Sequence, residues 1–163
     1  MNSEPTLAPT LTQLSSLTLV GLETRTTNAL EANPATARIG DNWQQFFGRG
    51  LGQAIPNQTN PHKLYGVYTR YASDFRGEYS QLVAAAVSDG DSATDLSVVH
   101  VPQARYLAFC GMGEMPQVTL QVWQQVWTCF ANSACPHQRA YTTDLEVYDS
   151  TRPEVIEILI AIV

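Results

Sequence analysis

The sequence predicts an α+β fold in which two β-α-β-β repeats form an antiparallel sheet, with two main helices on one face and a cleft between the halves. Short runs of β-branched and aromatic residues alternate with two longer segments of helical periodicity, in the same order in each half. The two helical segments also share a local pattern at a fixed offset, which indicates an internal duplication. The matching segments are Trp43-Gln44-Gln45-Phe46-Phe47 and Trp123-Gln124-Gln125-Val126-Trp127.

The first half is expected over residues 17–88. Its three strands are predicted at residues 17–24, 64–71 and 79–87. Asn33 and Pro34 provide a helix cap followed by a proline in the first turn. Gly40 weakens this start and moves it toward Asp41. The residues that then recur on one helical face are Ile39, Trp43, Phe46 and Phe47.

The second half is expected over residues 95–163. Its strands are predicted at residues 105–110, 141–148 and 155–163, with a short extra strand at 96–101. Gly111 and Gly113 are expected to end the first of these strands, and Pro116 to open a helix. This helix is apolar around a wide arc, so it is expected to pack on more than one side. Residues 1–16 are predicted to form a flexible N-terminal arm, and residues 17–163 a single domain.

Charge and composition argue against several classes of function. The formal net charge is −6, and the nine Lys and Arg residues are scattered, so no basic surface for direct nucleic-acid binding is expected. The longest apolar run, residues 158–163, is far too short to span a bilayer, and no secretory signal is recognisable. We therefore expect a cytoplasmic protein, with an oligomeric state that the sequence leaves open.

Sequence motifs for catalysis or metal binding are sparse. The three histidines and three cysteines fit no metal-ligand spacing, and neither a nucleophile elbow nor a phosphate-binding loop is present. No metal and no cofactor are expected. No catalytic residue is predicted.

Glu146 is the candidate functional residue. Strand alternation places Asp144, Glu146 and Tyr148 on one face. A carboxylate buried among aromatic rings has a raised pKa unless a cation compensates, and a ligand cation could do so. Neighbouring rings would add roughly 0.5–2 kcal/mol each through cation–π contacts. Alternation alone leaves open whether Glu146 is buried or lies on a solvated face.

The tyrosines and tryptophans of both halves could surround such a carboxylate. On the predicted strand at 64–71, Tyr65 and Tyr71 fall on one face and Tyr68 on the other. Periodicity does not show which of the rings line a cavity and which belong to the core.

Short motifs in a consistent order carry a resemblance to a known family over residues 17–163. They are Leu19-Val20-Gly21-Leu22-Glu23-Thr24, Thr27-Asn28, Trp43-x-x-Phe46, Ile55-Pro56-Asn57, the run from Tyr65 to Tyr79, Tyr106-x-Ala108-Phe109, Trp123-x-x-x-Trp127, Asp144-Leu145-Glu146-Val147-Tyr148 and Glu157-Ile158-Leu159-Ile160-Ala161-Ile162. In this order the chain resembles the GyrI-like, or AraC-type effector-binding, superfamily, including standalone members encoded on integron cassettes. The family often has Phe where this chain has Leu145.

The resemblance implies a standalone effector-binding domain whose cleft holds hydrophobic, often cationic, organic ligands. The family's acidic pocket residue matches Glu146. The aromatic pocket positions map to Tyr68, Tyr71, Trp123, Trp127, Tyr141, Trp43 and Phe47. Many relatives carry a DNA-binding domain, and none is expected in this sequence, so regulation of transcription would need a separate regulatory protein partner.

Two alternatives remain open beside ligand binding. One is a hydrolase of small electrophilic compounds, with Glu146 as base and a tyrosine as acid. The other is a protein-interaction module resembling gyrase inhibitors. Whether the chain is an enzyme is left open, and binding without turnover is the favoured hypothesis.

Overall fold

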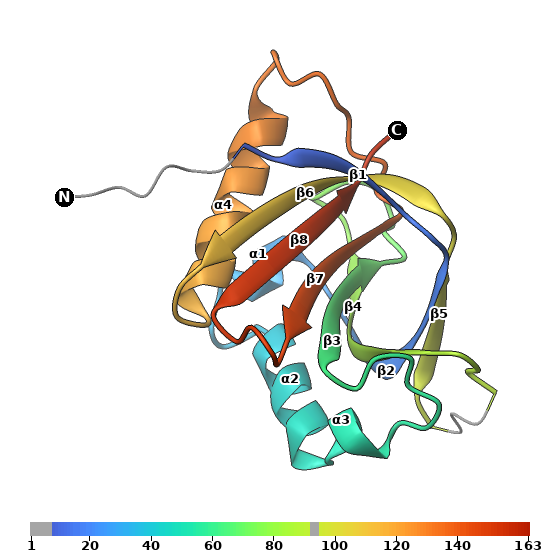
Figure 1. Cartoon of the computed structure of the whole chain (residues 1–163). Helices are drawn as coiled ribbons and strands as arrows, with labels where there is room; N and C mark the ends of the chain where they lie inside the picture. The colour runs from blue at the N-terminus through green and yellow to red at the C-terminus, as the bar shows by residue number, and fades with distance from the viewer. Residues whose placement is uncertain (1–7, 92–94) are drawn as a thin grey trace.

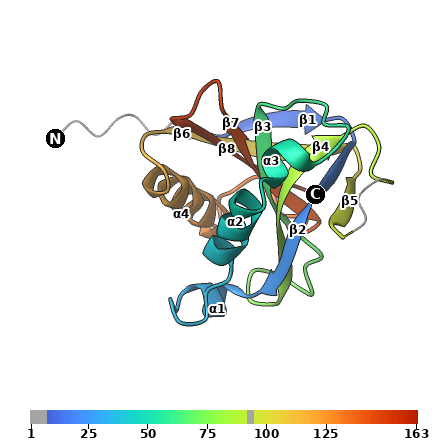
Figure 2. The same ribbon diagram turned by 90° about the horizontal axis from the view of Figure 1, so that it is seen from below.

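A curled antiparallel sheet forms the centre of the computed structural model, which describes residues 8–91 and 95–163 (Figure 1). Its eight strands are β1 (Thr10–Leu14), β2 (Leu17–Thr26), β3 (Lys63–Thr69), β4 (Tyr79–Val87), β5 (Ser97–Val101), β6 (Ala104–Met112), β7 (Thr143–Asp149) and β8 (Val155–Ala161). The helices are α1 (Asn28–Glu31), α2 (Ile39–Gly48), α3 (Leu51–Ala54) and α4 (Gln117–Ala131). The two longer helices, α2 and α4, lie next to each other on one side of the sheet (Figure 2).

The strand order, β1-β6-β8-β7-β3-β4-β2-β5, reflects the internal duplication. In each half the third strand pairs with both the first and the second, giving β2-β4-β3 and β6-β8-β7. The equivalent strands β3 and β7 then pair with each other at the centre. The strands that precede the halves are exchanged, since β1 pairs with β6 and β5 pairs with β2. The predicted α+β fold of two repeats is confirmed.

Alternation along the strands divides the apolar residues between the two faces of the sheet. Leu19, Leu82 and Leu145 belong to a core on the face away from α2 and α4. Beneath α4, isoleucines of β8 pack against valines of the helix. Beneath α2, Phe46 is fully buried against β2 and β4. Since Leu145 points away from the helices, its neighbour Glu146 points toward them.

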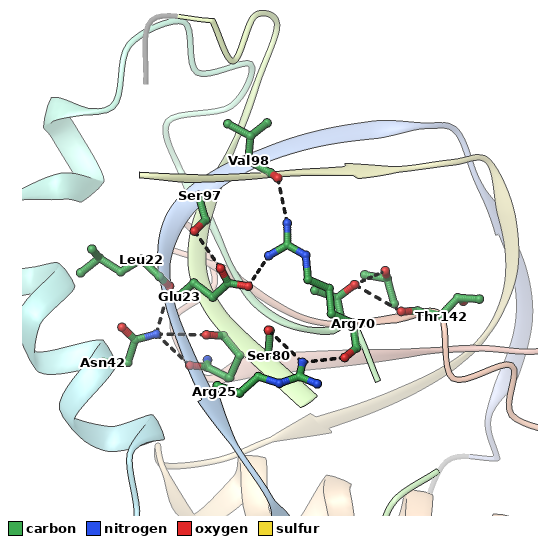
Figure 3. A network of polar contacts seen from close by, with 12 residues as sticks. Leu22, Glu23, Arg25, Asn42, Arg70, Ser80, Ser97, Val98 and Thr142 are labelled. Carbon is green, nitrogen blue, oxygen red and sulfur yellow. Dashed lines mark hydrogen bonds and ion pairs between the residues drawn. The ribbon is translucent and has the colours of Figure 1, made fainter. Parts of the chain in front are cut away.

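A polar network lies around the open end of the sheet (Figure 3). Arg70, just past β3, forms an ion pair with Glu23 on β2 and donates to the Val98 carbonyl on β5. Arg25 donates to the Arg70 carbonyl. Although burial opposes the effect, hydrogen bonds from Ser80, Ser97 and Arg70 lower the pKa of Glu23. The network therefore connects the β2–β5 edge with the end of the central strand β3.

The predicted N-terminal arm is wrong for residues 10–14. This segment forms β1, whose residues from Thr10 to Leu14 pair in register with β6 from Ala108 to Ala104. Alternating Thr and Leu side chains suit a sheet edge, and the sequence pattern gave no partner for them. Residues 1–7 of the predicted arm lie outside the described residues. The single domain at 17–163 stays a prediction, with β1 added to its N-terminal side.

Two strands are shorter than predicted because a non-glycine residue has a left-handed backbone conformation. Arg70 has φ 52°, so β3 ends at Thr69. The change of direction brings Tyr71 to the same side as Tyr68, and the predicted pairing of Tyr71 with Tyr65 on one face is wrong. Tyr141 also has φ 52°, and β7 begins only at Thr143.

The helix starts and one strand end also differ from the prediction. Thr27, rather than Asn33, caps a helix, the short α1, by accepting from the Leu30 amide. The longer α2 begins at Ile39. Strand β6 continues through Gly111, where a Cβ atom would lie 2.5 Å from Cγ2 of Val122. This glycine therefore permits the close approach of α4 and does not break the strand. None of the helices in the described ranges is long and apolar enough to cross a membrane.

Candidate functional site

A cleft of about 950 Å³ is lined by residues of α2, α4 and the sheet, at the junction of the two repeats. Its walls are mainly apolar and aromatic, and they come from both halves of the chain. Such a concave apolar site with a few polar groups is the usual form of a small-molecule site. The predicted cleft between the halves is therefore present.

Glu146, on β7, lies at the floor of this cleft with only 3% of its surface exposed. Three neutral donors surround its carboxylate. Trp123 Nε1 and Tyr68 Oη donate to Oε2 at 2.7 and 2.8 Å, and Tyr148 Oη donates to Oε1 at 3.0 Å. Within residues 8–91 and 95–163, Glu146 forms no ion pair. The carboxylate is thus solvated by dipoles and has no counter-ion.

Burial and hydrogen bonding act in opposite directions on the pKa of Glu146. Burial raises this pKa above the ordinary value, and the bonds from Trp123, Tyr68 and Tyr148 limit the rise. Burial and the adjacent negative charge raise the pKa values of Tyr68 and Tyr148, so both phenols keep their protons as donors. A positive group brought into the cleft would favour the ionised carboxylate.

Gly66 makes the space that the Glu146 side chain occupies. The two residues are direct partners in the β3–β7 register. A Cβ atom on Gly66 would lie 2.3 Å from Oε1 of Glu146. The absence of a side chain on β3 therefore lets the carboxylate lie flat across the neighbouring strand.

Asp144 lies two residues before Glu146 on the same face of β7, and it is fully buried. In contrast to Glu146, it has a counter-ion, because Arg139 Nη2 lies 2.7 Å from its Oδ2. Tyr71 Oη and the Ala161 amide also donate to this carboxylate, at 2.6 and 2.9 Å. Two buried carboxylates thus stand side by side, one paired within the chain and one not.

The cleft contains seven of the eight residues predicted to bind the ligand. They are Glu146, Tyr68, Tyr71, Trp123, Trp127, Trp43 and Phe47. The structure does not bring the eighth, Tyr141, into the lining. Its ring instead packs on Tyr71 and under the guanidinium of Arg139, with Cζ 4.5 Å from the ring centroid. The left-handed backbone at Tyr141 explains this placement, since the strand face used for the prediction begins two residues later.

The rings around Glu146 contact one another. Tyr68 meets Trp123 edge to face at 5.1 Å between centroids, and Trp123 is 6.1 Å from Trp127. On the α2 side, Trp43 lies 5.9 Å from Phe47. Phe47 and Trp127 are 60% and 47% exposed, so they stand at the mouth of the cleft.

Comparison with known proteins identifies the family. The model of an integron-associated effector-binding protein family, Cass2, matches residues 10–162. This chain belongs to that family. It is 37% identical to an integron cassette protein from the mobile metagenome of Vibrio cholerae, with 97% of each chain covered and a TM-score of 0.83. The comparison with curated protein sequences gave no match.

More distant structures share the fold. SAV2435, solved with bound tetraphenylphosphonium, is 19% identical to this chain, and the match covers 96% of this chain and 94% of SAV2435 with a TM-score of 0.75. The C-terminal domain of EcmrR is 11% identical to this chain, and the match covers 95% of this chain and 96% of the EcmrR domain with a TM-score of 0.52. The match to the effector-binding family makes this chain a ligand-binding domain, and the distant structures show that it shares their fold.

The sequence analysis did not predict several residues that line the cleft of this chain. Tyr79 and Glu31 line it, and so do Tyr148 and Arg139. Tyr148 was detectable, because it shares a strand face with Glu146. Arg139 precedes its strand and gave no periodic signal, and the role of Gly66 depends on the register between two distant strands.

Proposed function

We propose that the cleft binds hydrophobic organic cations and that Glu146 is the acidic residue that receives their charge. The observation that carries this proposal is a carboxylate 3% exposed at the floor of an aromatic cleft, held by three neutral donors without a cation. A bound cation supplies the missing counter-ion. It also stabilises the ionised form of a group whose pKa burial raises.

The contrast with Asp144 supports the proposal from within the same strand. Both carboxylates are buried, and both are satisfied by hydrogen bonds. Among the residues that the structure describes, Asp144 forms an ion pair with an arginine and Glu146 does not. If burial of a carboxylate on this face were merely structural, a counter-ion at both positions would be expected. The position that lacks one is the position that faces the cleft.

The aromatic lining suits the same class of ligand. Faces of tryptophan and tyrosine attract cations, by about 0.5–2 kcal/mol per contact. Delocalised or shielded cations with apolar groups lose little hydration on entering such a cleft. Tetraphenylphosphonium, which the structural neighbour SAV2435 holds, is of this kind and serves as the probe.

The test is calorimetric titration of the protein with tetraphenylphosphonium and with its anionic isostere, tetraphenylborate. We expect the cation to bind and the anion of similar shape not to bind. Glu146→Gln keeps the size of the side chain and removes the charge, so cation affinity should fall about 10- to 100-fold. Triphenylphosphine oxide, which is neutral, should bind the two proteins with affinities within about threefold of each other.

Glu157→Gln is the matched control. Glu157 lies on β8 and does not line the cleft, so this change alters the net charge by the same amount from elsewhere. Its cation affinity should remain within about twofold of wild type. Equal cation affinities for wild type and Glu146→Gln would refute the proposed role of Glu146.

A further inference from the structure

Arg139 is a second buried charged group in the wall of the cleft. Its side chain is only 7% exposed, although the residue precedes β7 in an irregular segment. The guanidinium is fixed from two sides, by the ion pair with Asp144 and by the ring of Tyr141 beneath it. The family's acidic pocket position does not involve this residue, and the proposed cation site does not use it.

The guanidinium retains unused donors. Of its three nitrogens, Nη2 donates to Asp144, and Nε is buried with no hydrogen-bond acceptor in the described part of the chain. Buried N–H groups of this kind are normally paired, and one without an acceptor calls for an explanation. Asp144 already accepts from Tyr71 and the Ala161 amide as well as from Nη2 of Arg139.

We propose that Arg139 is a hydrogen-bonding subsite for an uncharged acceptor, such as an amide or ester carbonyl, on the same ligand whose cationic group meets Glu146. This inference rests on the proposed function and narrows the ligand class to organic cations with a carbonyl at a set distance. Nε is covered from solvent in the free protein, so donation to the carbonyl requires the guanidinium to shift toward the cleft when the ligand binds.

The charges around the subsite determine that the acceptor is neutral. Asp144 cancels the charge of Arg139, so the pair presents donors without net positive charge. Glu146 and Glu31, which both line the cleft, add negative charge nearby. A ligand carboxylate would be repelled by these groups, whereas a carbonyl accepts the hydrogen bond without that repulsion.

Strand geometry gives the approximate length of the ligand. Asp144 and Glu146 are two residues apart on β7, so their Cα atoms are separated by about 7 Å. The guanidinium of Arg139 lies next to Asp144, at the distance of one ion pair from its carboxylate. A carbonyl about 6–9 Å from the cationic centre should therefore reach the subsite. A linker of about three to five methylene groups, together with its bonds to the cationic centre and to the carbonyl carbon, spans roughly this distance.

The experiment compares three triphenylphosphonium ligands with the same chain of about four methylenes, ending in a methyl, a primary amide or a carboxylate. Affinities for wild-type protein are measured by calorimetry at neutral pH. We expect the amide to bind about tenfold more tightly than the alkyl ligand, and the carboxylate more weakly than both. An amide that binds no better than the alkyl ligand at any chain length from three to five would overturn the inference.

Variants separate this subsite from the rest of the cleft. In Arg139→Met combined with Asp144→Asn, which avoids leaving a buried charge unpaired, the amide should lose its advantage while the alkyl ligand keeps its affinity within about threefold. An amide advantage that survives in this variant would place the acceptor elsewhere. If the alkyl ligand itself fails to bind wild type, or binds Glu146→Gln equally well, the proposed function fails before the subsite is reached.

Discussion

Replacing Gly66 with alanine tests whether the space on β3 positions the Glu146 carboxylate. The new Cβ atom would lie 2.3 Å from Oε1 and 3.1 Å from Cδ of Glu146, whereas ordinary contact begins at 3.4 Å. The carboxylate must therefore retreat by about 1 Å, taken as the difference between these contact distances. Such a shift lengthens the bonds from Tyr68, Trp123 and Tyr148 beyond hydrogen-bonding range.

The expected loss of stability follows from these displacements. Overpacking of a buried site costs about 1–3 kcal/mol, and each weakened bond to a charged group adds to it. Gly66→Ala should lower the free energy of unfolding by about 2–4 kcal/mol. Urea unfolding followed by tryptophan fluorescence measures this change.

A double-mutant cycle isolates the contact from other effects of the glycine. In a Glu146→Ala background, the atoms of the carboxyl group are gone, and Gly66→Ala should cost less than about 0.5 kcal/mol. In a Glu146→Gln background the clash with the new Cβ atom persists, so Gly66→Ala should still cause most of its loss in unfolding free energy. If Gly66→Ala costs the same in all three backgrounds, Gly66 does not act by making space for this side chain.

Three further outcomes follow from the site and the packing around it. The affinity for tetraphenylphosphonium should fall toward that of Glu146→Gln as the pH is lowered through the pKa of Glu146; because burial raises that pKa, calorimetry should detect the decline already above pH 4.5, with no decline for triphenylphosphine oxide. Because the pKa of Glu146 is raised in the folded chain, the folded chain keeps this proton to a higher pH than the unfolded chain does. The free energy of unfolding of wild type relative to Glu146→Gln should therefore decrease as the pH rises from 4.5 through the folded-state pKa, measured by urea titration. A difference that stays constant with pH would contradict this. Phe46→Ala should lower the free energy of unfolding by about 3–5 kcal/mol, because Phe46 is fully buried. Phe47→Ala, at the exposed neighbour, should change this free energy by no more than about 0.5 kcal/mol and weaken cation binding about two- to fivefold. Equal losses of stability in the two variants would contradict the burial of Phe46 and the exposure of Phe47.

The elements of the fold could be predicted largely from residue patterns. The period of Trp43 and Phe46 on α2 and the strand alternation around Glu146 both follow from local geometry. Strand pairing did not, because β1 and β5 each pair with the opposite half of the chain, and no local pattern carries that information. The sequence repeat implied the duplication but not the exchange of these edge strands.

The cleft was predictable only as far as its residues belong to regular elements. Trp123 and Glu146 could be assigned to faces, because the helix and strand that carry them are regular. Tyr71 and Tyr141 were assigned to strand faces that do not extend to them, because left-handed backbone at Arg70 and Tyr141 ends the regular geometry. A positive φ at a non-glycine residue has no reliable sequence signal, so both assignments depended on a feature that appears only in the structure.

The way Glu146 is held supports the cation binding that we propose, because it commits the carboxylate to no single cation. An arginine beside Glu146, as beside Asp144, would satisfy the carboxylate permanently and leave nothing for a ligand to contribute. Without any donors, the same burial would keep the group protonated and neutral at physiological pH. The donors Trp123, Tyr68 and Tyr148 lie between these extremes, because they favour the ionised form yet bring no charge of their own. In the proposed function, the ionised carboxylate makes the difference in affinity between a cation and a neutral molecule of the same shape.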